Sequence, residues 1–172
     1  MSETGKLDVR VRYPEDGDKL DDHKVGRDET VGSFKSRVLV AFDLKEGVDE
    51  KGELVTFGLF HEQVTLKDPE TLGSVAADAH ELHLKLERQR HYFFYKKHEI
   101  RSATKTATGA QIKAKIKAVD PDFDLNHTLI EEGHGHEEDK VIEDGQTVLL
   151  TVDSAHPVKH FFSKPPTNFG AR

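Results

Sequence analysis

The sequence predicts an α+β fold made of two small domains in tandem, each a mixed sheet packed on one helix. Three observations predict it. The chain of 172 residues is long enough for two domains of about 80 residues each. Short alternating runs of apolar and polar residues, typical of strands, flank one apolar stripe at helical spacing in each half. The second half repeats the order of these segments.

The first half is expected to fold as two strands, a helix and three further strands. The strands are placed at 7–11, 19–25, 54–60, 63–66 and 82–86. A turn cluster from Pro14 to Asp18 makes the first two strands a hairpin, and residues 68–72 are expected to form another turn. Asp28 or Thr30 can cap the helix. Its buried face is expected to comprise Val31, Phe34, Val38 and Ala41 or Phe42.

The second half is expected to follow the same order. Its strands are placed at 92–95, 98–102, 128–130, 141–142 and 158–163. Thr108 and Gln111 have the spacing of a capping box at the start of the helix. Ile112, Ile116 and Val119 are spaced to form its buried face, and the helix is expected to end at residues 120–122, where Pro121 follows Asp120.

The two halves also correspond residue by residue. An offset of 76 residues pairs Leu66 with Ile142, Asp68 with Asp144, and Thr71–Leu72 with Thr147–Val148. Near the helices an offset of 78 pairs Thr30 with Thr108, Phe34 with Ile112, and Val38 with Ile116. A single repetition indicates duplication of a small domain, because a solenoid needs three or more units. The domains are therefore placed at 6–88 and 90–163, followed by a tail at 164–172.

The register of the last strand depends on a slip of one residue. The gapless correspondence puts His160 opposite Leu84, whereas a slip of one puts Phe161 there. Such a slip exchanges the two faces of a strand. We expect Phe161 to face the core, because burying an unpaired imidazole costs more than exposing a ring.

Composition excludes several classes of function. Cysteine is absent, which rules out disulfides, a cysteine zinc site and a catalytic thiol in this chain. The net charge of −7 makes binding to nucleic acid or to an anionic membrane unexpected. Residues 1–4 do not open a signal peptide, and no apolar run could span a membrane. A cytoplasmic location is therefore expected.

Histidines and carboxylates gather between Gly133 and Asp139. A His-x-His pair beside acidic residues can bind zinc or nickel, so a metal protein is one alternative. The ligands do not form a convincing set at fixed spacing, however. We expect a solvated loop and no metal.

The tail from Lys164 to Arg172 is the second candidate site. Pro165 and Pro166 cannot continue a central strand, so the chain must leave the sheet here and favours an extended conformation. Only Gly170 has no side chain to obstruct a narrow channel, and Phe169 beside it offers an apolar anchor. From the residues alone, a frayed terminus with a chance glycine is the alternative.

Two sets of motifs resemble known families. The segment Leu66–Leu72 followed by Leu82–Leu86 resembles the end of ubiquitin, where a Leu-acid-Asp-Gly-x-Thr-Leu turn precedes a Leu-His-Leu strand. Residues 108–112, 120–123 and 160–166 resemble the bacterial multiubiquitin family. The whole chain is similar to the tandem ubiquitin-like modifiers of bacterial Bil-type antiphage operons. This resemblance implies two ubiquitin-like β-grasp domains.

The same resemblance implies a modifier precursor and not an enzyme. Its implied partners are an E1-like adenylating enzyme that uses ATP, an E2-like conjugating enzyme, a JAB-type metallopeptidase and a target protein, possibly from phage. The chain itself would need no cofactor. The peptidase would remove Ala171 and Arg172, and Gly170 would then be joined to the target. Pro165, Pro166 and Phe169 would serve tail recognition. The chain departs from ubiquitin in lacking a terminal Gly-Gly. The alternative is a non-covalent adaptor with an inert tail.

Overall fold

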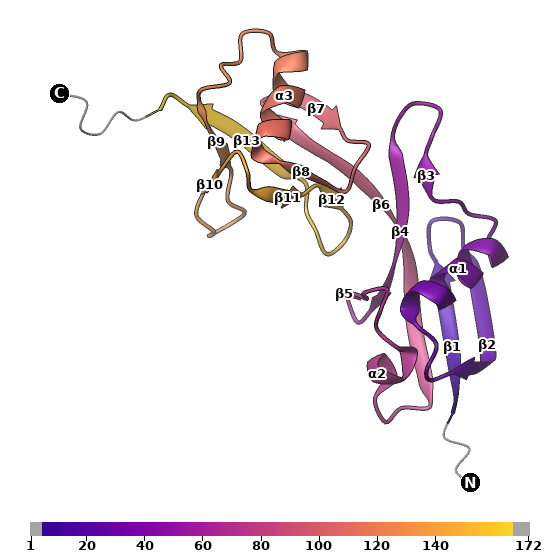
Figure 1. Ribbon diagram of the computed structural model, residues 1–172. Helices are drawn as coiled ribbons and strands as arrows, with labels where there is room; N and C mark the ends of the chain where they lie inside the picture. Colours follow the sequence, from indigo (N-terminus) through magenta and orange to yellow (C-terminus); the bar gives the residue numbers. More distant parts are fainter. Residues whose placement is uncertain (1–4, 167–172) are drawn as a thin grey trace. The chain divides into compact units, whose positions relative to one another are not determined.

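The computed structural model describes residues 5–166 (Figure 1). Its strands are β1 (Lys6–Tyr13), β2 (Asp18–Gly26), β3 (Gly47–Val48), β4 (Leu54–His61), β5 (Val64–Thr65), β6 (Glu81–Tyr95), β7 (His98–Arg101), β8 (Thr106–Thr108), β9 (Thr128–Glu131), β10 (Lys140–Ile142), β11 (Thr147–Leu149), β12 (Thr151–Val152) and β13 (Lys159–Lys164). Its helices are α1 (Val31–Ala41), α2 (Leu72–Ala76) and α3 (Gly109–Val119). Parallel and antiparallel strand pairs combine with few helices, so the chain has the α+β character that the sequence predicts.

The described chain divides into two compact units. Unit 1 comprises residues 5–47, 55–89 and 153–155, and unit 2 comprises residues 48–54, 90–152 and 156–166. The sequence predicts uninterrupted domains. In the structure, residues 48–54 belong to unit 2 and residues 153–155 belong to unit 1. Within residues 5–166, no helix combines the length and the apolar character needed to cross a membrane.

In unit 1 the strands follow the order β2-β1-β6-β4-β5. The hairpin β1–β2 is antiparallel, and β1 runs parallel to β6, with Val11 opposite Leu84. Strand β4 pairs antiparallel with β6, with Leu59 opposite Leu86, and it also pairs with the short strands β5 and β3. The last strand of the unit therefore lies in the centre of its sheet.

Unit 2 has the same order of pairings, β7-β6-β13-β9-β10. Residues 92–95 of β6 form an antiparallel hairpin with β7, and β6 runs parallel to β13, with Tyr95 opposite Phe161. Strand β13 pairs antiparallel with β9, which pairs antiparallel with β10. Each step of the unit 1 arrangement, including the central last strand, recurs here.

The cores of the two units follow the predicted patterns closely. In β1 every second residue is buried, and in α1 Val31, Phe34 and Val38 face the core as expected, with Thr30 as the N-cap. Of the alternatives Ala41 and Phe42, Phe42 packs against the core and Ala41 is exposed, and Leu39 is buried in addition. The four-residue spacing from Phe34 to Val38 defines the middle of this face, and Leu39 widens it.

In unit 2 the predicted capping box of α3 is present and Ile112 and Ile116 are fully buried. The expectation for Val119 is wrong, because its side chain is 44% exposed. It is the last helical residue, and Phe123 fills the core instead after the chain turns at Asp120. The predicted register of the last strand is confirmed, since Phe161 is buried and His160 is exposed.

Strand β6 differs most from the prediction, because residues 81–95 form one strand where two were expected. Buried positions are even-numbered up to Leu86 and odd-numbered from Gln89 onward. The set of residues that faces the core therefore shifts by one position within a continuous strand. Two polar residues at the change are buried and bonded. Gln89 Oε1 accepts a bond from Thr56 Oγ1 at 2.8 Å, and His91 Nδ1 lies 3.0 Å from Thr151 Oγ1.

Several short elements were not expected at all. They are α2, which follows the predicted turn at residues 68–72 and begins at Leu72, and strands β3, β8, β11 and β12. Strands β8 and β11 pair with each other, with Thr108 opposite Thr147. In unit 1 the corresponding residues Thr30 and Thr71 form an isolated antiparallel bridge. The duplicated threonines therefore make the same backbone contact in both units.

A buried lysine is the most specific repeated contact. Lys35 and Lys113, 78 residues apart, are each 8% exposed and occupy the same position in α1 and α3. Lys35 Nζ lies 3.5 Å from Asp68, and Lys113 Nζ lies 2.8 Å from Asp144. Each ammonium also donates to a backbone carbonyl at 3.3 Å. Charge pairing and backbone bonding make the burial of each lysine tolerable.

Candidate functional site

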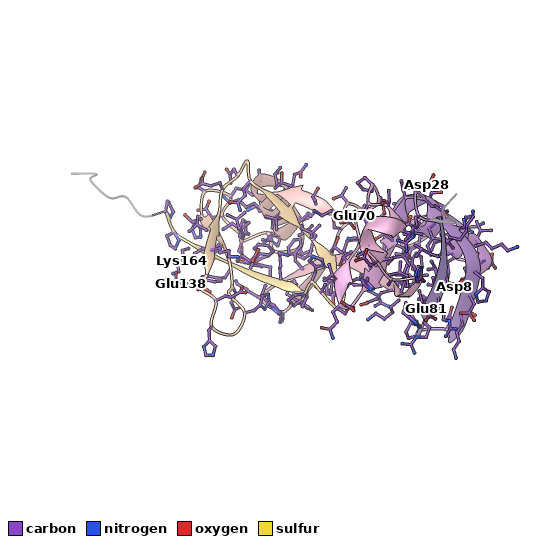
Figure 2. All side chains as sticks on the ribbon, turned by 90° about the horizontal axis from the view of Figure 1, so that it is seen from below. Asp8, Asp28, Glu70, Glu81, Glu138 and Lys164 are labelled. Atoms are coloured by element: carbon purple, nitrogen blue, oxygen red, sulfur yellow. The ribbon has the colours of Figure 1, made fainter. Side chains whose placement is uncertain are left out.

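Strand β13 carries the candidate site at its end. Its neighbours are β6 and β9, and the last pair in its ladder joins Lys164 to Thr128. Lys164 is labelled in Figure 2. The strand was expected to end at Ser163 and ends one residue later, directly before Pro165 and Pro166, which are exposed. Proline has no N–H to continue a ladder, so the two prolines account for the end of the strand.

The remaining predicted site residues lie beyond this point. Phe169, Gly170 and Ala171 are outside the described residues. The corresponding strand end in unit 1 has a different continuation, because β6 runs on into unit 2. Only the last strand of unit 2 therefore leads into a tail.

The outer side of the unit 2 sheet carries a cluster of rings and aliphatic side chains that the sequence analysis missed. We call its six residues the aromatic face: Tyr92, Phe94, Ile130, Val141, His160 and Phe162. Cross-strand pairing places them in neighbouring positions, with Phe94 opposite His160, and Ile130 opposite both Phe162 and Val141. None of the six belongs to the buried core cluster of unit 2. The signal in the sequence is that apolar residues occupy consecutive positions at 92–95 and 161–162.

Ring contacts organise the aromatic face. Phe94 stacks on His160 with ring centroids 5.1 Å apart, and Tyr92 meets Phe94 edge-on at 5.9 Å. Lys164 Nζ lies 5.7 Å from the centroid of Phe162. Val141 is 57% exposed, whereas Ile130 is buried. The face therefore presents partly exposed, mutually supported rings.

The outer side of the unit 1 sheet is charged at the matching positions. The equivalents of Tyr92, Phe94, His160 and Phe162, by pairing position, are Asp8, Arg10, His83 and Lys85. Asp8 and Glu81 are labelled in Figure 2. Arg10 Nε lies 3.1 Å from Glu81 and 3.7 Å from Asp21. Phe60, which matches Ile130, is 2% exposed, and Lys85 Nζ lies 5.6 Å from its centroid.

The loop from Gly133 to Asp139 does not bring metal ligands together. Asp139 Oδ1 accepts a bond from Gly133 N at 2.9 Å, and the carbonyl of His134 accepts one from Glu137 N at 3.0 Å. Residues 136–139 are exposed. Across residues 5–166, the structure forms no group of three His, Asp or Glu side chains arranged to hold a metal.

The strongest pKa perturbations lie in unit 1 and serve its fold. Arg37 on α1 bonds Asp22 on β2 at 3.0 Å and Glu29 at 2.8 Å. The bond from Arg37 lowers the pKa of Asp22, and the bonds to Glu29 and Asp22 raise the pKa of Arg37. Burial, with the bond to Glu15, raises the pKa of Tyr13 to about 12.

Comparison with known proteins finds similarity among solved structures. No protein-family model matches the chain, and no curated protein matches it. Among solved structures, the chain is similar to Caldiarchaeum subterraneum ubiquitin, with 23% identity and a TM-score of 0.37. That match covers 48% of this chain and 91% of the archaeal protein.

Proposed function

We propose that this chain is a ubiquitin-like modifier precursor made of two β-grasp domains, acting in the cytoplasm. The observation that carries the proposal is the end of β13. A strand with neighbours on both sides stops at Lys164, two exposed prolines follow, and the sequence beyond contains Gly170 near the terminus. The repeated strand order of the two units supports the domain assignment.

The proposed chemistry needs only a carboxylate at the end of the tail. A JAB-type metallopeptidase hydrolyses the Gly170–Ala171 bond and releases the dipeptide Ala171-Arg172. An E1-like enzyme joins the new carboxylate to AMP from ATP and releases pyrophosphate. A cysteine thiolate then displaces AMP to form a thioester, which passes to an E2-like enzyme. A lysine amine of the target displaces the thiol and forms the amide.

In this scheme the chain contributes access and recognition rather than catalysis. Gly170 presents a carboxylate with no Cβ beside it, which suits a narrow adenylation channel. Pro165 and Pro166 favour an extended segment between the sheet and the reacting end. Phe169 supplies an apolar anchor next to the glycine.

The test combines the purified chain with its peptidase, activating enzyme and ATP, followed by intact mass spectrometry. We expect loss of Ala171-Arg172, then an adenylate or thioester at Gly170. Gly170→Val should fold normally yet form neither product, because the added side chain obstructs the channel. A chain that ends at Gly170 should no longer need the peptidase.

Gly5→Val is the matched control, because a Cβ at Gly5 meets nothing within 4 Å. It should be processed and activated like the parent. Retention of Ala171-Arg172, or normal conjugation by Gly170→Val, would contradict the proposal.

A non-covalent adaptor is the second candidate function. The aromatic face favours it, since an exposed apolar sheet surface can bind a protein without any covalent step. In the same experiment an adaptor would keep its full mass under all conditions.

A further inference from the structure

The outer side of the unit 1 sheet holds three like charges in one row. Arg12 on β1 lies directly opposite Lys19 on β2 and Lys85 on β6, and we call these three residues the basic row. Neighbouring strands are about 4.8 Å apart, so like charges at opposite positions destabilise a sheet. Lys85 Nζ lies 3.2 Å from Glu87, whereas the ion pairs within residues 5–166 include neither Arg12 nor Lys19. The fold therefore keeps uncompensated positive charge at this place.

The basic row lines a groove of about 730 Å³, which is within the range of small-molecule sites, about 300–1,000 Å³. Four cations and two carboxylates line this groove and give it a formal charge of +2 with His83 neutral: Arg10, Arg12, Lys19, Lys85, Asp21 and Glu62. The whole chain, in contrast, has a net charge of −7. A positive groove on an acidic chain concentrates small anions locally.

A strained turn also lines the groove. Glu62 and Gln63 connect β4 to β5, and their φ angles are 51° and 70°. Two-residue hairpin turns with both φ angles positive are usually built from asparagine and glycine, which adopt this conformation at low cost. Other residues held in such a conformation cluster at ligand sites. The turn brings the amide of Gln63, which has two N–H donors, to the groove that the basic row lines.

We propose that this groove binds the phosphate chain of a small polyanion such as triphosphate. The three charges of the basic row extend over two strand spacings, about 10 Å, which suits several linked phosphates better than one. The planar guanidinium of Arg12 can donate two parallel hydrogen bonds to a phosphate. Lys85 is held over the ring of Phe60, with Nζ 5.6 Å from the centroid. Bound phosphates offset the repulsion within the row.

Nucleic acid suits the groove less well, because the net charge of −7 on the chain repels an extended polyanion. A small anion contacts the groove alone and avoids the acidic remainder of the surface. Its binding does not depend on the proposed modifier function, because the groove residues named above all lie in unit 1.

Heteronuclear NMR titration of the full chain with sodium tripolyphosphate tests the proposal. We expect saturable shifts confined to amides of β1, β2, the turn at 62–63 and the unit 1 part of β6. The Kd should be on the order of 100 μM at about 50 mM salt and rise at least about tenfold at about 500 mM, because salt screens exposed charges. Inorganic phosphate should bind at least about tenfold more weakly, since it reaches fewer cations of the row. ATP is titrated in parallel, because a triphosphate chain also occurs in nucleotides. Equal affinity for ATP assigns recognition to the phosphates alone, and tighter binding of ATP adds a contact to the nucleoside.

Substitution of Arg12 separates binding from stability. Arg12→Gln should weaken tripolyphosphate binding by about tenfold yet raise the melting temperature of the free chain by about 1–4 °C, because it removes repulsion from the centre of the row. Arg12→Lys keeps the charge and should weaken binding only about threefold, through loss of the planar fork. Lys96→Gln is the matched control, because Lys96 follows Tyr95 in unit 2 as Arg12 follows Val11 in the matching register. It removes the same charge and should bind tripolyphosphate like the parent.

Three results would overturn the proposal. The first is the absence of saturable shifts with both tripolyphosphate and ATP at about 5 mM. The second is equal weakening by Arg12→Gln and Lys96→Gln, which would mean that only the net charge matters. The third is a set of shifts centred on unit 2, which would place the anion elsewhere. Gly170→Val should bind tripolyphosphate normally, so failure of the modifier function leaves this test intact.

Discussion

Units 1 and 2 share one arrangement of strands, but the outer surfaces of their sheets differ in chemical character. Both place their last strand at the centre of the sheet, and both bury a helix lysine against an aspartate. At the matching outward positions, however, unit 1 has Arg10 and Lys85 where unit 2 has Phe94 and Phe162. The comparison separates what the fold requires from what it leaves free. The inward pattern and the helix contacts recur, whereas the outward positions differ in chemistry and can specialise.

The largest effects should come from the matched core residues Phe34 and Ile112, both fully buried. Phe34→Ala should cost about 3–5 kcal/mol and Ile112→Ala about 2–5 kcal/mol, because each leaves a cavity. Each change should reduce hydrogen-exchange protection mainly in its own unit. Equal loss of protection in both units after either change would show that the two cores unfold together.

The next effects concern the buried lysines and sharpen the comparison. Asp144→Asn should destabilise unit 2 by about 1–2 kcal/mol, because it removes the 2.8 Å ion pair of Lys113. Asp68→Asn should cost less, about 0.5 kcal/mol, because Lys35 keeps Glu46 at 3.7 Å. Urea denaturation of both variants measures the difference. A larger loss for Asp68→Asn would reverse our ranking of the two pairs.

Helix caps give a smaller difference between the units. Thr108 and Gln111 bond reciprocally at 3.2 and 2.8 Å, whereas Ser33, at the matching position of α1, bonds Thr30 through its backbone alone, and its hydroxyl makes a long 3.4 Å bond to Glu29. Gln111→Ala should therefore cost about 0.5 kcal/mol and Ser33→Ala almost nothing. Thermal unfolding of the two variants provides the measurement. Similar melting temperatures for both would mean that the reciprocal bond adds no stability.

The smallest effect at neutral pH concerns Tyr13. Its ionisation makes the stability of unit 1 differ from that of unit 2 only in alkaline solution. Its pKa is raised to about 12 in the folded state, from an ordinary value of 10.0. The contribution of neutral Tyr13 to the free energy of unfolding is fully present below pH 10. It is lost as the pH rises towards 12, because Tyr13 ionises more easily in the unfolded chain. Unit 1 should lose stability over this range. Tyr13→Phe should remove that part of the pH dependence, and an unchanged profile would assign it to other groups.

The sequence predicts the parts of this fold that follow local periodicity. Ile112 and Ile116, the capping box at Thr108, and the inward position of Phe161 all depend on spacing within a few residues. What could not be predicted depends on contacts between distant segments. Strands β8, β11 and β12 have two or three residues each, too few for a periodic signal.

The candidate site was only partly accessible to sequence analysis. The end of β13 near Ser163 follows from the two prolines, which need no tertiary information. The aromatic face could not be assigned beforehand, because Phe93 and Phe94 are equally apolar and only the sheet decides which one faces outward. The role of Gly170 stays a prediction.

The continuous strand β6 also has a consequence for the lifetime of the protein. Proteases cut extended backbone that is not already paired, but Gln89 pairs with Thr56 and Arg90 pairs with Val152 at the junction of the units. Gln89 is only 8% exposed and also bonds Asp153 at 3.0 Å. Within β6, a degrading enzyme therefore meets paired backbone at residues 89 and 90. In a cell the chain should be removed whole, and half-length fragments should not accumulate.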